Sequence, residues 1–256
     1  MSNSLICELI GNHIINEEFF VLQFPWEKPV PKAGQFFMLR HLRSTVYLPR
    51  PISVFEYNDE QKTVKFLISR KGRGTEELSG LNAGERVHLT GPLGNTWEEF
   101  LPENGKVALV GGSAGIAPLC ALIAEKPKND FHFFAGFRQG FREKDHENAV
   151  LGAALHAKKL VISAEDGRNA LIGRIVDFIF EPENYDAFFA CGPAAMLKAL
   201  YQKCETKNTH CFISLENRFA CGVGACFGCT INTKNGNRRC CKDGPIFKAS
   251  EVLFDG

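Results

Sequence analysis

Four cysteines in the last quarter of the chain constrain its fold more than any other feature. Cys221, Cys226 and Cys229 lie within one short run that also holds three glycines, and Cys241 follows twelve residues later. This C-x4-C-x2-C…C spacing is typical of a plant-type [2Fe–2S] site. Because glycine turns freely at positive φ, such a loop can wrap closely around a small inorganic cluster. The run therefore predicts three thiolate ligands on one loop and a fourth from a separate segment.

Zinc is an alternative, because it also takes four thiolates, but its ligands usually come as two C-x2–4-C pairs. Reduced structural cysteines are a second alternative. Disulfides fit poorly: residues 1–20 lack a basic region and an apolar core, and Glu8, Glu17 and Glu18 interrupt them, so no export signal is visible. We therefore expect a cytoplasmic chain, in which clustered cysteines indicate metal binding or catalysis.

The residues alone leave the fourth ligand open. Cys240 and Cys241 are adjacent, and their side chains cannot both point into one site. Four further cysteines lie in apolar patterns and are expected to be small core residues, as free cysteine often is. They are Cys7, Cys120, Cys204 and Cys211.

Length and charge limit the function classes. The 256 residues suit two domains better than one, and 30 basic against 29 acidic residues leave no electrostatic footprint for nucleic acid. The longest uncharged run, Val107–Ala124, is long enough for a membrane helix, but Gly111, Gly112, Gly115 and Pro118 break it. We interpret it as a buried strand, a tight loop and a helix start, and expect a soluble protein.

Residues 1–100 have the pattern of an all-β domain. Short segments rich in β-branched and aromatic residues alternate with turn clusters such as Lys32-Ala33-Gly34. Many short strands at this spacing indicate a small barrel. The expected strands are Leu5–Ile10, Phe19–Phe24, Gln35–Leu39, Thr63–Ile68 and Arg86–Leu89.

From Lys106 strands alternate with helices, which predicts a doubly wound parallel α/β sheet over residues 101–213. Residues 214–256 then form a small cysteine-bearing module. The expected strands are Val107–Val110, Phe131–Ala135, Leu160–Ser163 and Ala187–Ala190, and the expected helices are 116–125, 148–156, 172–179 and 194–203.

The first turn of this α/β domain reads Gly111-Gly112-Ser113-Ala114-Gly115. Glycines let the main chain approach a pyrophosphate, and the following helix N-terminus favours its negative charge. The spacing is G-G-x-x-G, and glycines at such turns also serve plain helix–strand packing. The position after an apolar strand and before a helix favours a dinucleotide site.

Two further motifs lie in the β domain. Arg50-Pro51-Ile52-Ser53 places a bidentate guanidinium beside a rigid proline and a hydroxyl, which suits a phosphate and a ring edge. Lys71-Gly72-Arg73-Gly74-Thr75 follows a strand, where its glycines would expose backbone N–H groups as an anion-binding nest. For either motif alone, a solvated basic loop is the alternative.

Together these motifs resemble the ferredoxin-reductase superfamily, whose members pair a flavin barrel with a nicotinamide-nucleotide domain. Cys191-Gly192-Pro193 adds to this likeness. Residues 214–226, Ser-Leu-Glu-Asn-Arg-Phe-Ala-Cys-Gly-Val-Gly-Ala-Cys, and the closing Cys241-Lys242-Asp243-Gly244-Pro245 resemble the electron-transfer subunits of NAD-dependent dihydroorotate dehydrogenases. The likeness spans nearly the whole chain. One departure is Thr96-Trp97, where the family commonly has a glycine and an aliphatic or aromatic residue.

The resemblance implies which residues hold the cofactors. It places Arg50 on the FAD diphosphate and Ser53 near flavin N5, and it selects Cys241 as the fourth cluster ligand because that ligand directly precedes x-D-G-P. The rest of the implied flavin site is Pro51, Ile52, Leu67, Ile68, Ser69, Gly72, Gly74 and Thr75. The implied nicotinamide-nucleotide site is Gly111, Gly112, Gly115, Cys191, Gly192 and Pro193.

The resemblance also places the end of the third α/β strand near the adenosine ribose. Glu165 and Asp166 lie there, and two carboxylates would repel a 2′-phosphate while one accepts hydrogen bonds from a ribose hydroxyl. An ordinary acidic turn is the alternative, since Asp-Gly is a common turn dipeptide. We therefore predict NAD and not NADP.

Flavin exchanges a hydride with nicotinamide and single electrons with an iron–sulfur cluster, so we name no catalytic residue. The resemblance implies a partner, the FMN-containing catalytic subunit of dihydroorotate dehydrogenase, in a hetero-oligomer of pyrimidine biosynthesis. The alternatives are a related reductase subunit of a hydrogenase, a sulfide dehydrogenase or a ferredoxin–nicotinamide reductase; a self-sufficient flavoenzyme; and a zinc-stabilised binding module without redox function.

Overall fold

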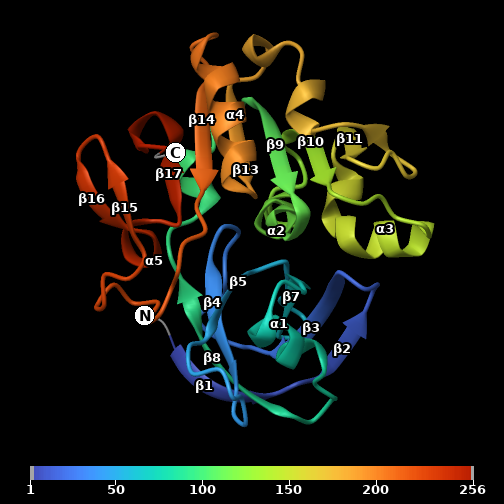
Figure 1. Cartoon of the computed structure of the whole chain (residues 1–256), viewed down its shortest axis with the longest axis vertical. Coiled ribbons are helices and arrows are strands. Elements are labelled where there is room, and N and C mark those ends of the chain that lie inside the picture. The colour runs from blue at the N-terminus through green and yellow to red at the C-terminus, as the bar shows by residue number, and fades with distance from the viewer. Residues whose placement is uncertain (1–2, 255–256) are drawn as a thin grey trace.

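The computed structural model describes residues 3–254, with β-sheets in the lower half, an α/β region above and the C-terminal segment along one side (Figure 1). The lower half contains two antiparallel sheets. One has the order β1 (Asn3–Glu8), β8 (Arg86–Leu93), β4 (Phe36–His41), β5 (Arg50–Ser53). The other has the order β2 (Gly11–Ile14), β3 (Phe19–Pro25), β7 (Thr63–Ser69), β6 (Glu56–Asn58). Helix α1 (Arg73–Ser79) follows β7, and the 3-10 turn η1 (Trp97–Phe100) leads out of the barrel.

The two sheets share one aromatic core, and this arrangement confirms the small barrel. The Phe37 ring lies 4.7 Å from Trp26 and 5.3 Å from Phe66 between ring centroids, and all three side chains are buried. Edge-to-face packing of this kind adds to the area that the rings bury. The core therefore holds strands of both sheets against each other.

The upper half is a seven-stranded sheet, parallel except at one edge. Its order is β12 (Leu171–Ile172), β11 (Lys159–Ala164), β10 (Asp130–Phe137), β9 (Lys106–Gly112), β13 (Ala187–Cys191), β14 (His210–Ser214), β17 (Ile246–Lys248). Its α-helices are α2 (Ala117–Glu125), α3 (Lys144–Leu151) and α4 (Ala194–Glu205), and its 3-10 turns are η2 (Ser113–Ile116), η3 (Gly152–His156), η4 (Ile175–Phe178) and η5 (Pro182–Asn184). The chain builds outward from β9 in one direction and then returns to β13 on its other side, so a topological switch point separates β9 from β13.

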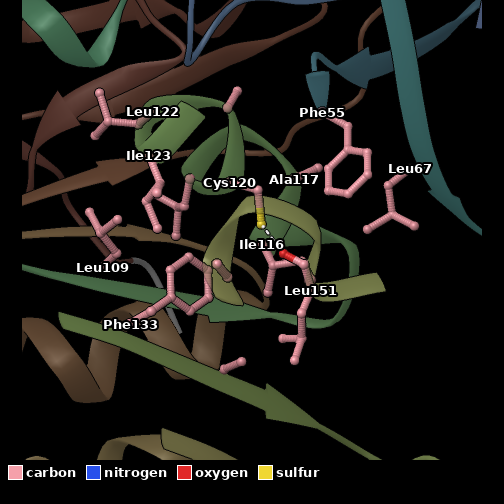
Figure 2. Packing of buried hydrophobic residues seen from close by; sticks show 14 of the residues in the cluster. Phe55, Leu67, Leu109, Ile116, Ala117, Cys120, Leu122, Ile123, Phe133 and Leu151 are labelled. Atoms are coloured by element: carbon pink, nitrogen blue, oxygen red, sulfur yellow. Dashed lines mark hydrogen bonds between the residues drawn. The ribbon is translucent and has the colours of Figure 1, made fainter. Parts of the chain in front are cut away.

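Helix α2 packs in the core that joins the two halves (Figure 2). Ile116, at the entrance to the helix, is buried in the same cluster as Leu109 and Phe133 of the sheet. The barrel contributes Phe55 and Leu67 to this cluster. The Cys120 thiol, also in the cluster, donates a hydrogen bond of 3.0 Å to the carbonyl of Leu151. A continuous core of this kind fixes the barrel against the α/β domain.

The C-terminal segment adds one strand to the upper sheet and forms a separate two-stranded sheet. It contains the hairpin β15 (Thr230–Thr233) and β16 (Gly236–Arg239), helix α5 (Cys240–Asp243), strand β17 and the 3-10 turn η6 (Ala249–Glu251). Strand β17 pairs antiparallel with β14, and Asn95 exchanges two side-chain hydrogen bonds with the backbone of Ile246 at 2.9 and 3.0 Å. The C-terminal segment is thereby tied to both other regions.

Three local predictions differ from the structure. The helix predicted over 172–179 is wrong: Gly173 adopts φ +128°, and only the short η4 turn follows. The helix predicted over 148–156 begins earlier, at Lys144, and Gly152 at φ +51° divides it from η3. Residues 73–79 form α1, although the glycines at 72 and 74 indicated a loop.

The four cysteines expected in the core are buried, namely Cys7, Cys120, Cys204 and Cys211. Within residues 3–254, no helix has both the length and the apolar character needed to span a membrane.

Candidate functional site

A cavity of about 200 Å³ opens where the barrel meets the C-terminal segment, and we call it the barrel cavity. The barrel lines it from β5 and β7, and the C-terminal segment lines it with residues 214–217, Phe219 and Pro245. Nine of the predicted site residues lie in its wall: Arg50, Pro51, Ile52, Ser53, Leu67, Ile68, Ser69, Thr75 and Cys191.

Arg50 has a buried donor atom without a partner in the described part of the chain and lies in the wall of this cavity. Its Nη2 donates a 2.9 Å hydrogen bond to the carbonyl of Leu48, while its buried Nε has no hydrogen-bond partner among the described residues. Gly74 lies beneath the guanidinium, and a Cβ there would be 2.8 Å from Arg50 Cδ. Gly74 therefore makes room for Arg50, although it does not itself line the barrel cavity.

Two backbone donors of the anion-binding nest predicted over Lys71–Thr75 have partners within the segment itself. The Thr75 hydroxyl accepts the backbone N–H groups of Lys71 and Gly72 at 2.9 and 3.2 Å, and these donors are therefore already used. Gly72 lines neither the barrel cavity nor the larger cavity of the α/β domain. The segment instead begins α1 and positions Thr75 in the wall of the barrel cavity.

That larger cavity, of about 870 Å³, lies at the C-terminal edge of the parallel sheet, and we call it the sheet-edge cavity. Of the predicted nucleotide residues, Gly112, Glu165 and Pro193 line it. Gly111, Gly115 and Gly192 do not line either cavity and serve close packing: a Cβ on Gly115 would be 2.4 Å from the carbonyl oxygen of Cys191, and one on Gly192 would be 2.9 Å from the Gly112 nitrogen.

Asp166 does not line the sheet-edge cavity. Its Oδ1 accepts the backbone N–H groups of Gly140 and Arg168 at 2.9 and 3.1 Å. These hydrogen bonds, and to a smaller extent the nearby Arg168 charge, hold the pKa of the Asp166 carboxyl below its usual range. Of the two carboxylates predicted at this edge, the structure brings only Glu165 to the cavity.

Other residues of the sheet-edge cavity were not predicted from the sequence motifs. Ser163 is fully buried at the end of β11, and its Oγ has no hydrogen-bond partner among the described residues. Arg138 and Arg174 add positive charge to the wall, and Glu18 enters from the barrel. Ser163 and Arg138 could have been predicted from their position at the carboxyl ends of strands, where doubly wound sheets bind their ligands. No sequence feature indicated Glu18. Glu216, missed in the same way, lines the barrel cavity.

The two cavities meet. Ser69 and Lys71, at and just after the end of β7, line both of them. Cys191 belongs to the wall of the barrel cavity, while Pro193, two residues later, belongs to the sheet-edge cavity. Groups bound in the two cavities would therefore approach each other at β7 and at the end of β13.

The cysteine loop stabilises a thiolate with its own backbone. Burial acts to raise the pKa of Cys221, but hydrogen bonds from the backbone N–H groups of Cys226 and Val223, together with the Cys226 side chain, lower that pKa to about 6. Gly222 and Gly224 take φ values of +71° and +82°, which let these N–H groups turn inward. Backbone N–H groups arranged in this way stabilise the thiolate form of a cysteine.

The structure places Cys241 beside a loop cysteine. Cys241 Sγ lies 3.2 Å from Cys229 Sγ, and burial together with Cys229 raises the pKa of Cys241 to about 12. Cys240 is buried in the apolar cluster. Arg239 fixes the start of α5 through hydrogen bonds to Gly224 and Asp243.

The four cysteines predicted as ligands thus form two pairs, Cys221 with Cys226 and Cys229 with Cys241. Among residues 3–254, no group of three or more cysteine, histidine or carboxylate side chains is arranged to hold a single metal ion. Two pairs of thiols suit the two metal centres of a [2Fe–2S] cluster, whereas structural zinc takes four ligands around one centre.

The loop is packed against the barrel, beside the barrel cavity. A Cβ on Gly222 would be 2.7 Å from Met38 Cγ, and the Phe219 ring, whose centroid is 5.1 Å from that of Phe36, lines the cavity together with Phe36. Trp97, the departure from the family pattern, is fully buried and stacks on Phe189 at 4.9 Å. It packs between barrel and sheet and lies outside the wall of the barrel cavity.

Known proteins share both the cysteine segment and the rest of the chain. The family model described as the iron–sulfur cluster binding domain of dihydroorotate dehydrogenase B matches residues 216–253. The electron transfer subunit of dihydroorotate dehydrogenase B (NAD(+)) from Clostridium acetobutylicum is 39% identical over 224 residues, which is 88% of this chain and 87% of that protein. The subunit of the same name from Caldanaerobacter subterraneus is 34% identical over 252 residues, 96% of this chain and 97% of that protein.

Solved structures share the fold. An NADH-dependent reduced ferredoxin-NADP oxidoreductase matches all of this chain and 92% of its own with a TM-score of 0.82 at 24% identity. A ferredoxin NADP+ reductase from Neisseria gonorrhoeae matches 80% of this chain and 91% of its own with a TM-score of 0.65 at 17% identity. The sequence identity to the relatives from Clostridium acetobutylicum and Caldanaerobacter subterraneus over most of the chain shows that the chain belongs to the family of dihydroorotate dehydrogenase B (NAD(+)) electron transfer subunits.

Proposed function

We propose that this chain carries electrons between a dihydroorotate-oxidising subunit and NAD through a [2Fe–2S] cluster and FAD. The observation that carries the proposal is the arrangement of three sites in sequence: the cysteine loop packs on the barrel next to Phe219 in the wall of the barrel cavity, and the barrel cavity meets the sheet-edge cavity at Ser69 and Lys71. An electron carrier needs neighbouring cofactor sites of this kind. Family membership supplies the oxidoreductase class.

The barrel cavity fits FAD. The buried, unpaired Nε of Arg50 is a donor for a diphosphate oxygen, and the extended segment Arg50–Ser53 along the wall supplies backbone and hydroxyl groups for a ring edge. Cys191 and residues 214–217 form the opposite part of the wall. We assign Arg50, Ser53, Ser69 and Thr75 to flavin binding.

The sheet-edge cavity fits NAD. It lies at the switch point of the parallel sheet, where doubly wound folds bind their ligands. Gly112 admits the backbone close to a phosphate, and the orphaned Ser163 Oγ is a hydrogen-bonding group that a nucleotide would satisfy. Glu165 at the rim would accept a hydrogen bond from a ribose hydroxyl.

The cysteine loop fits a [2Fe–2S] cluster, with Cys221, Cys226, Cys229 and Cys241 as ligands. When bound, the flavin exchanges a hydride with the nicotinamide and single electrons with the cluster. The chain's residues contribute binding, orientation and exclusion of water. The partner is then the dihydroorotate dehydrogenase catalytic subunit, and we place the complex in the cytoplasm, where cysteine ligands stay reduced.

Metal and flavin analysis of the purified chain tests the cofactor proposal. We expect one FAD and two irons per chain, with the brown-yellow colour of both groups. Zinc in place of iron would support the alternative of a zinc-stabilised binding module instead.

Co-purification tests the partner. We expect the tagged chain to bring down a subunit that oxidises dihydroorotate, and the pair to reduce NAD when dihydroorotate is added. Reduction of a small physiological substrate by the isolated chain would favour a self-sufficient flavoenzyme, and a hydrogenase or sulfide dehydrogenase subunit in the pull-down would favour one of the sibling systems.

A further inference from the structure

Glu18 joins the barrel to the glycine turn of the nucleotide domain inside the sheet-edge cavity. It lies in the connection between β2 and β3, and its Oε1 accepts a 2.9 Å hydrogen bond from the hydroxyl of Ser113. Its Oε1 is also 3.4 Å from Ser69 Oγ, at the end of β7. All three residues line the sheet-edge cavity, and Ser69 also lines the barrel cavity. One carboxylate thus lies where the two cavities meet.

The backbone around Glu18 fixes its position. Its N–H donates to Asn16 Oδ1 at 2.9 Å, and its carbonyl accepts the N–H of Arg70 at 2.8 Å. The next residue, Phe19, is buried and packs edge-on against Phe137 of the nucleotide domain at 6.1 Å. The carboxylate is therefore held by a rigid frame that spans β3 and β7.

Ser113 occupies an unfavourable conformation. Its φ is +51°, a left-handed region that a non-glycine residue enters only with backbone strain. The preceding Gly112 has no space for a side chain, since a Cβ there would be 2.7 Å from Pro193 Cδ. The turn is thus tightly constrained, and the hydrogen bond to Glu18 helps to hold Ser113 in its strained position.

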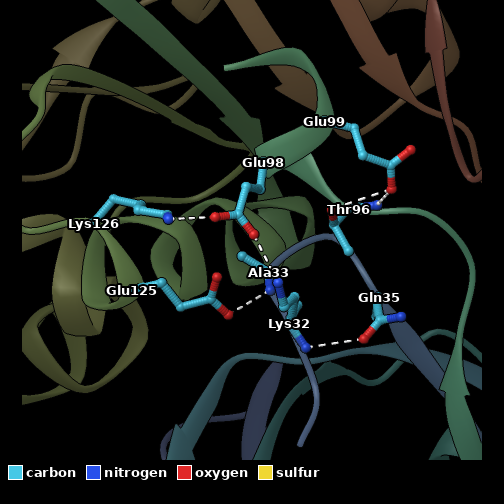
Figure 3. A network of polar contacts seen from close by, with 8 residues as sticks. All are labelled: Lys32, Ala33, Gln35, Thr96, Glu98, Glu99, Glu125 and Lys126. Atoms are coloured by element: carbon cyan, nitrogen blue, oxygen red, sulfur yellow. Dashed lines mark hydrogen bonds and ion pairs between the residues drawn. The ribbon is translucent and has the colours of Figure 1, made fainter. Parts of the chain in front are cut away.

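A second polar contact between the two regions differs in its location. Glu125 at the end of α2 accepts the N–H of Ala33 at 2.6 Å, and Glu98 pairs with Lys32 and Lys126 (Figure 3). None of these five residues lines either cavity. This outer contact holds the domains together, whereas the Glu18–Ser113 contact acts at the place where two bound groups would meet.

We propose that Glu18 is a positioning residue for hydride transfer. Through Ser113 it sets the position of the glycine turn at residues 111–115, and hence of a nicotinamide in the sheet-edge cavity, relative to β7 and the flavin. The proposal rests on the proposed function, because it presumes that the two cavities hold these groups. Small displacements matter here, since a misplacement of about 1 Å can slow a reaction by about 100-fold.

Four variants of the holoprotein test the proposal: Glu18→Ala, Glu18→Gln, Ser113→Ala and the double variant Glu18→Ala/Ser113→Ala. The matched control is Glu18→Gln, which removes the charge but retains an oxygen that accepts the Ser113 hydroxyl. The measurements are the limiting rate of flavin reduction by NADH and the dissociation constant for NADH, taken separately by stopped-flow absorbance.

We expect Glu18→Ala and Ser113→Ala each to lower the limiting rate about 10- to 100-fold while the dissociation constant changes less than about threefold. The double variant should be no slower than either single one, because both remove the same hydrogen bond. Glu18→Gln should stay within about threefold of the native rate. An unchanged rate in Glu18→Ala, or additive losses in the double variant, would overturn the proposal. A slow Glu18→Ala beside a native-like Ser113→Ala would also overturn it, because Glu18 would then act on the ligand directly.

Hydrogen exchange gives a readout that does not depend on activity. In the holoprotein without NADH, Glu18→Ala and Ser113→Ala should both accelerate exchange of the backbone amides at 111–116, and Glu18→Gln should not. Unchanged exchange in both alanine variants would count against the positioning role. If native protein did not oxidise NADH at all, the proposed function would fail, while the exchange data would still decide whether Glu18 holds the turn.

Discussion

The cysteine loop and the two cavities are built in opposite ways. The four predicted cluster ligands lie within residues 221–241, and the backbone N–H groups that lower the pKa of Cys221 come from the next five residues of the same loop. The walls of the cavities are assembled from residues as far apart as Glu17 and Pro245, in three regions of the chain. The loop is partly exposed, with Cys226 accessible and Phe227 62% exposed, whereas the cavity walls are continuous with the buried cores.

This difference predicts two kinds of failure. A change in the loop should remove the metal centre and leave the rest of the protein folded, because few long-range contacts depend on a single thiol. A change at the junction of the cavities should disturb several regions together, because the same atoms hold β9, β13 and the barrel in place. Substitutions in the two regions therefore test this difference.

The largest expected effect is loss of the cluster in Cys241→Ser. Cys241 Sγ lies 3.2 Å from Cys229 Sγ, so its removal would leave one pair of ligands incomplete. The matched control is Cys240→Ser at the adjacent position, which changes a thiol in the apolar cluster. Iron analysis and visible absorbance should show two irons per chain in the control and a near-complete loss in Cys241→Ser. The reverse pattern would show that Cys240 is the ligand.

The next effect should appear in Gly115→Ala. A Cβ at this position would be 2.4 Å from the Cys191 carbonyl oxygen and 2.8 Å from Gly192 Cα, and backbone atoms cannot move aside cheaply. We expect a loss of about 1–3 kcal/mol in the free energy of unfolding, as in other overpacked sites, together with weaker NADH binding. Gly11→Ala is the control, because its Cβ would meet nothing within 4 Å. Equal stability of the two variants would contradict the close packing between η2 and β13.

The same contrast explains what the sequence could predict. Ligand spacing and strand–helix alternation are local patterns, so the cysteine loop, the barrel strands and the parallel sheet were all accessible. The packing partner of Gly115 was not accessible, because Cys191, whose carbonyl leaves no room for a side chain at Gly115, is far away in the chain. The surroundings of Asp166 were not accessible for a related reason: its side chain accepts hydrogen bonds from the backbone N–H groups of Gly140 and Arg168, and no local pattern records the contact with Gly140.

The α1 helix illustrates a different limit. Two glycines favoured a loop over residues 71–75, but the Thr75 hydroxyl bonds back to Lys71 and Gly72 and begins a helical turn. Gly74 is required because Arg50 packs against it, and a side chain at Gly74 would bring its Cβ within 2.8 Å of Arg50 Cδ. A tertiary contact, not local propensity, thus selected the glycine. Such contacts become visible only when the fold is known.

A smaller effect is expected at the nucleotide rim in Glu165→Gln. The sheet-edge cavity also holds Arg138 and Arg174, which would attract a 2′-phosphate once the carboxylate is neutralised. We expect the preference for NADH over NADPH to fall about tenfold, or about 1.4 kcal/mol, in steady-state flavin reduction. Asp166→Asn should leave the preference unchanged, since Asp166 does not line the cavity. A change in Asp166→Asn alone would reverse the assignment of the two carboxylates.

The smallest effect concerns the outer contact between barrel and nucleotide domain, which lies away from both cavities (Figure 3). Hydrogen bonds from Lys126 and Lys32, followed by their charges, lower the pKa of Glu98 to about 2 from an ordinary value of 4.5. The Glu98 side chain is 40% exposed, so solvent screens the pairs, and Glu98→Gln should cost about 1 kcal/mol or less. For a chain of this size that is about 2–4 °C in Tm.

The pH dependence of this effect has a definite sign. Because folding lowers the Glu98 pKa, the ion pairs contribute fully above pH 4.5 and lose their contribution as the pH falls from about 4.5 to about 2. The Tm difference between native protein and Glu98→Gln should therefore be largest at neutral pH, shrink below pH 4.5 and also shrink in about 1 M salt. Glu99→Gln is the control, since Glu99 accepts the Thr96 N–H at 2.9 Å and a glutamine oxygen can do the same. A Tm difference that is independent of both pH and salt would mean that Glu98 acts through packing and not through its charge.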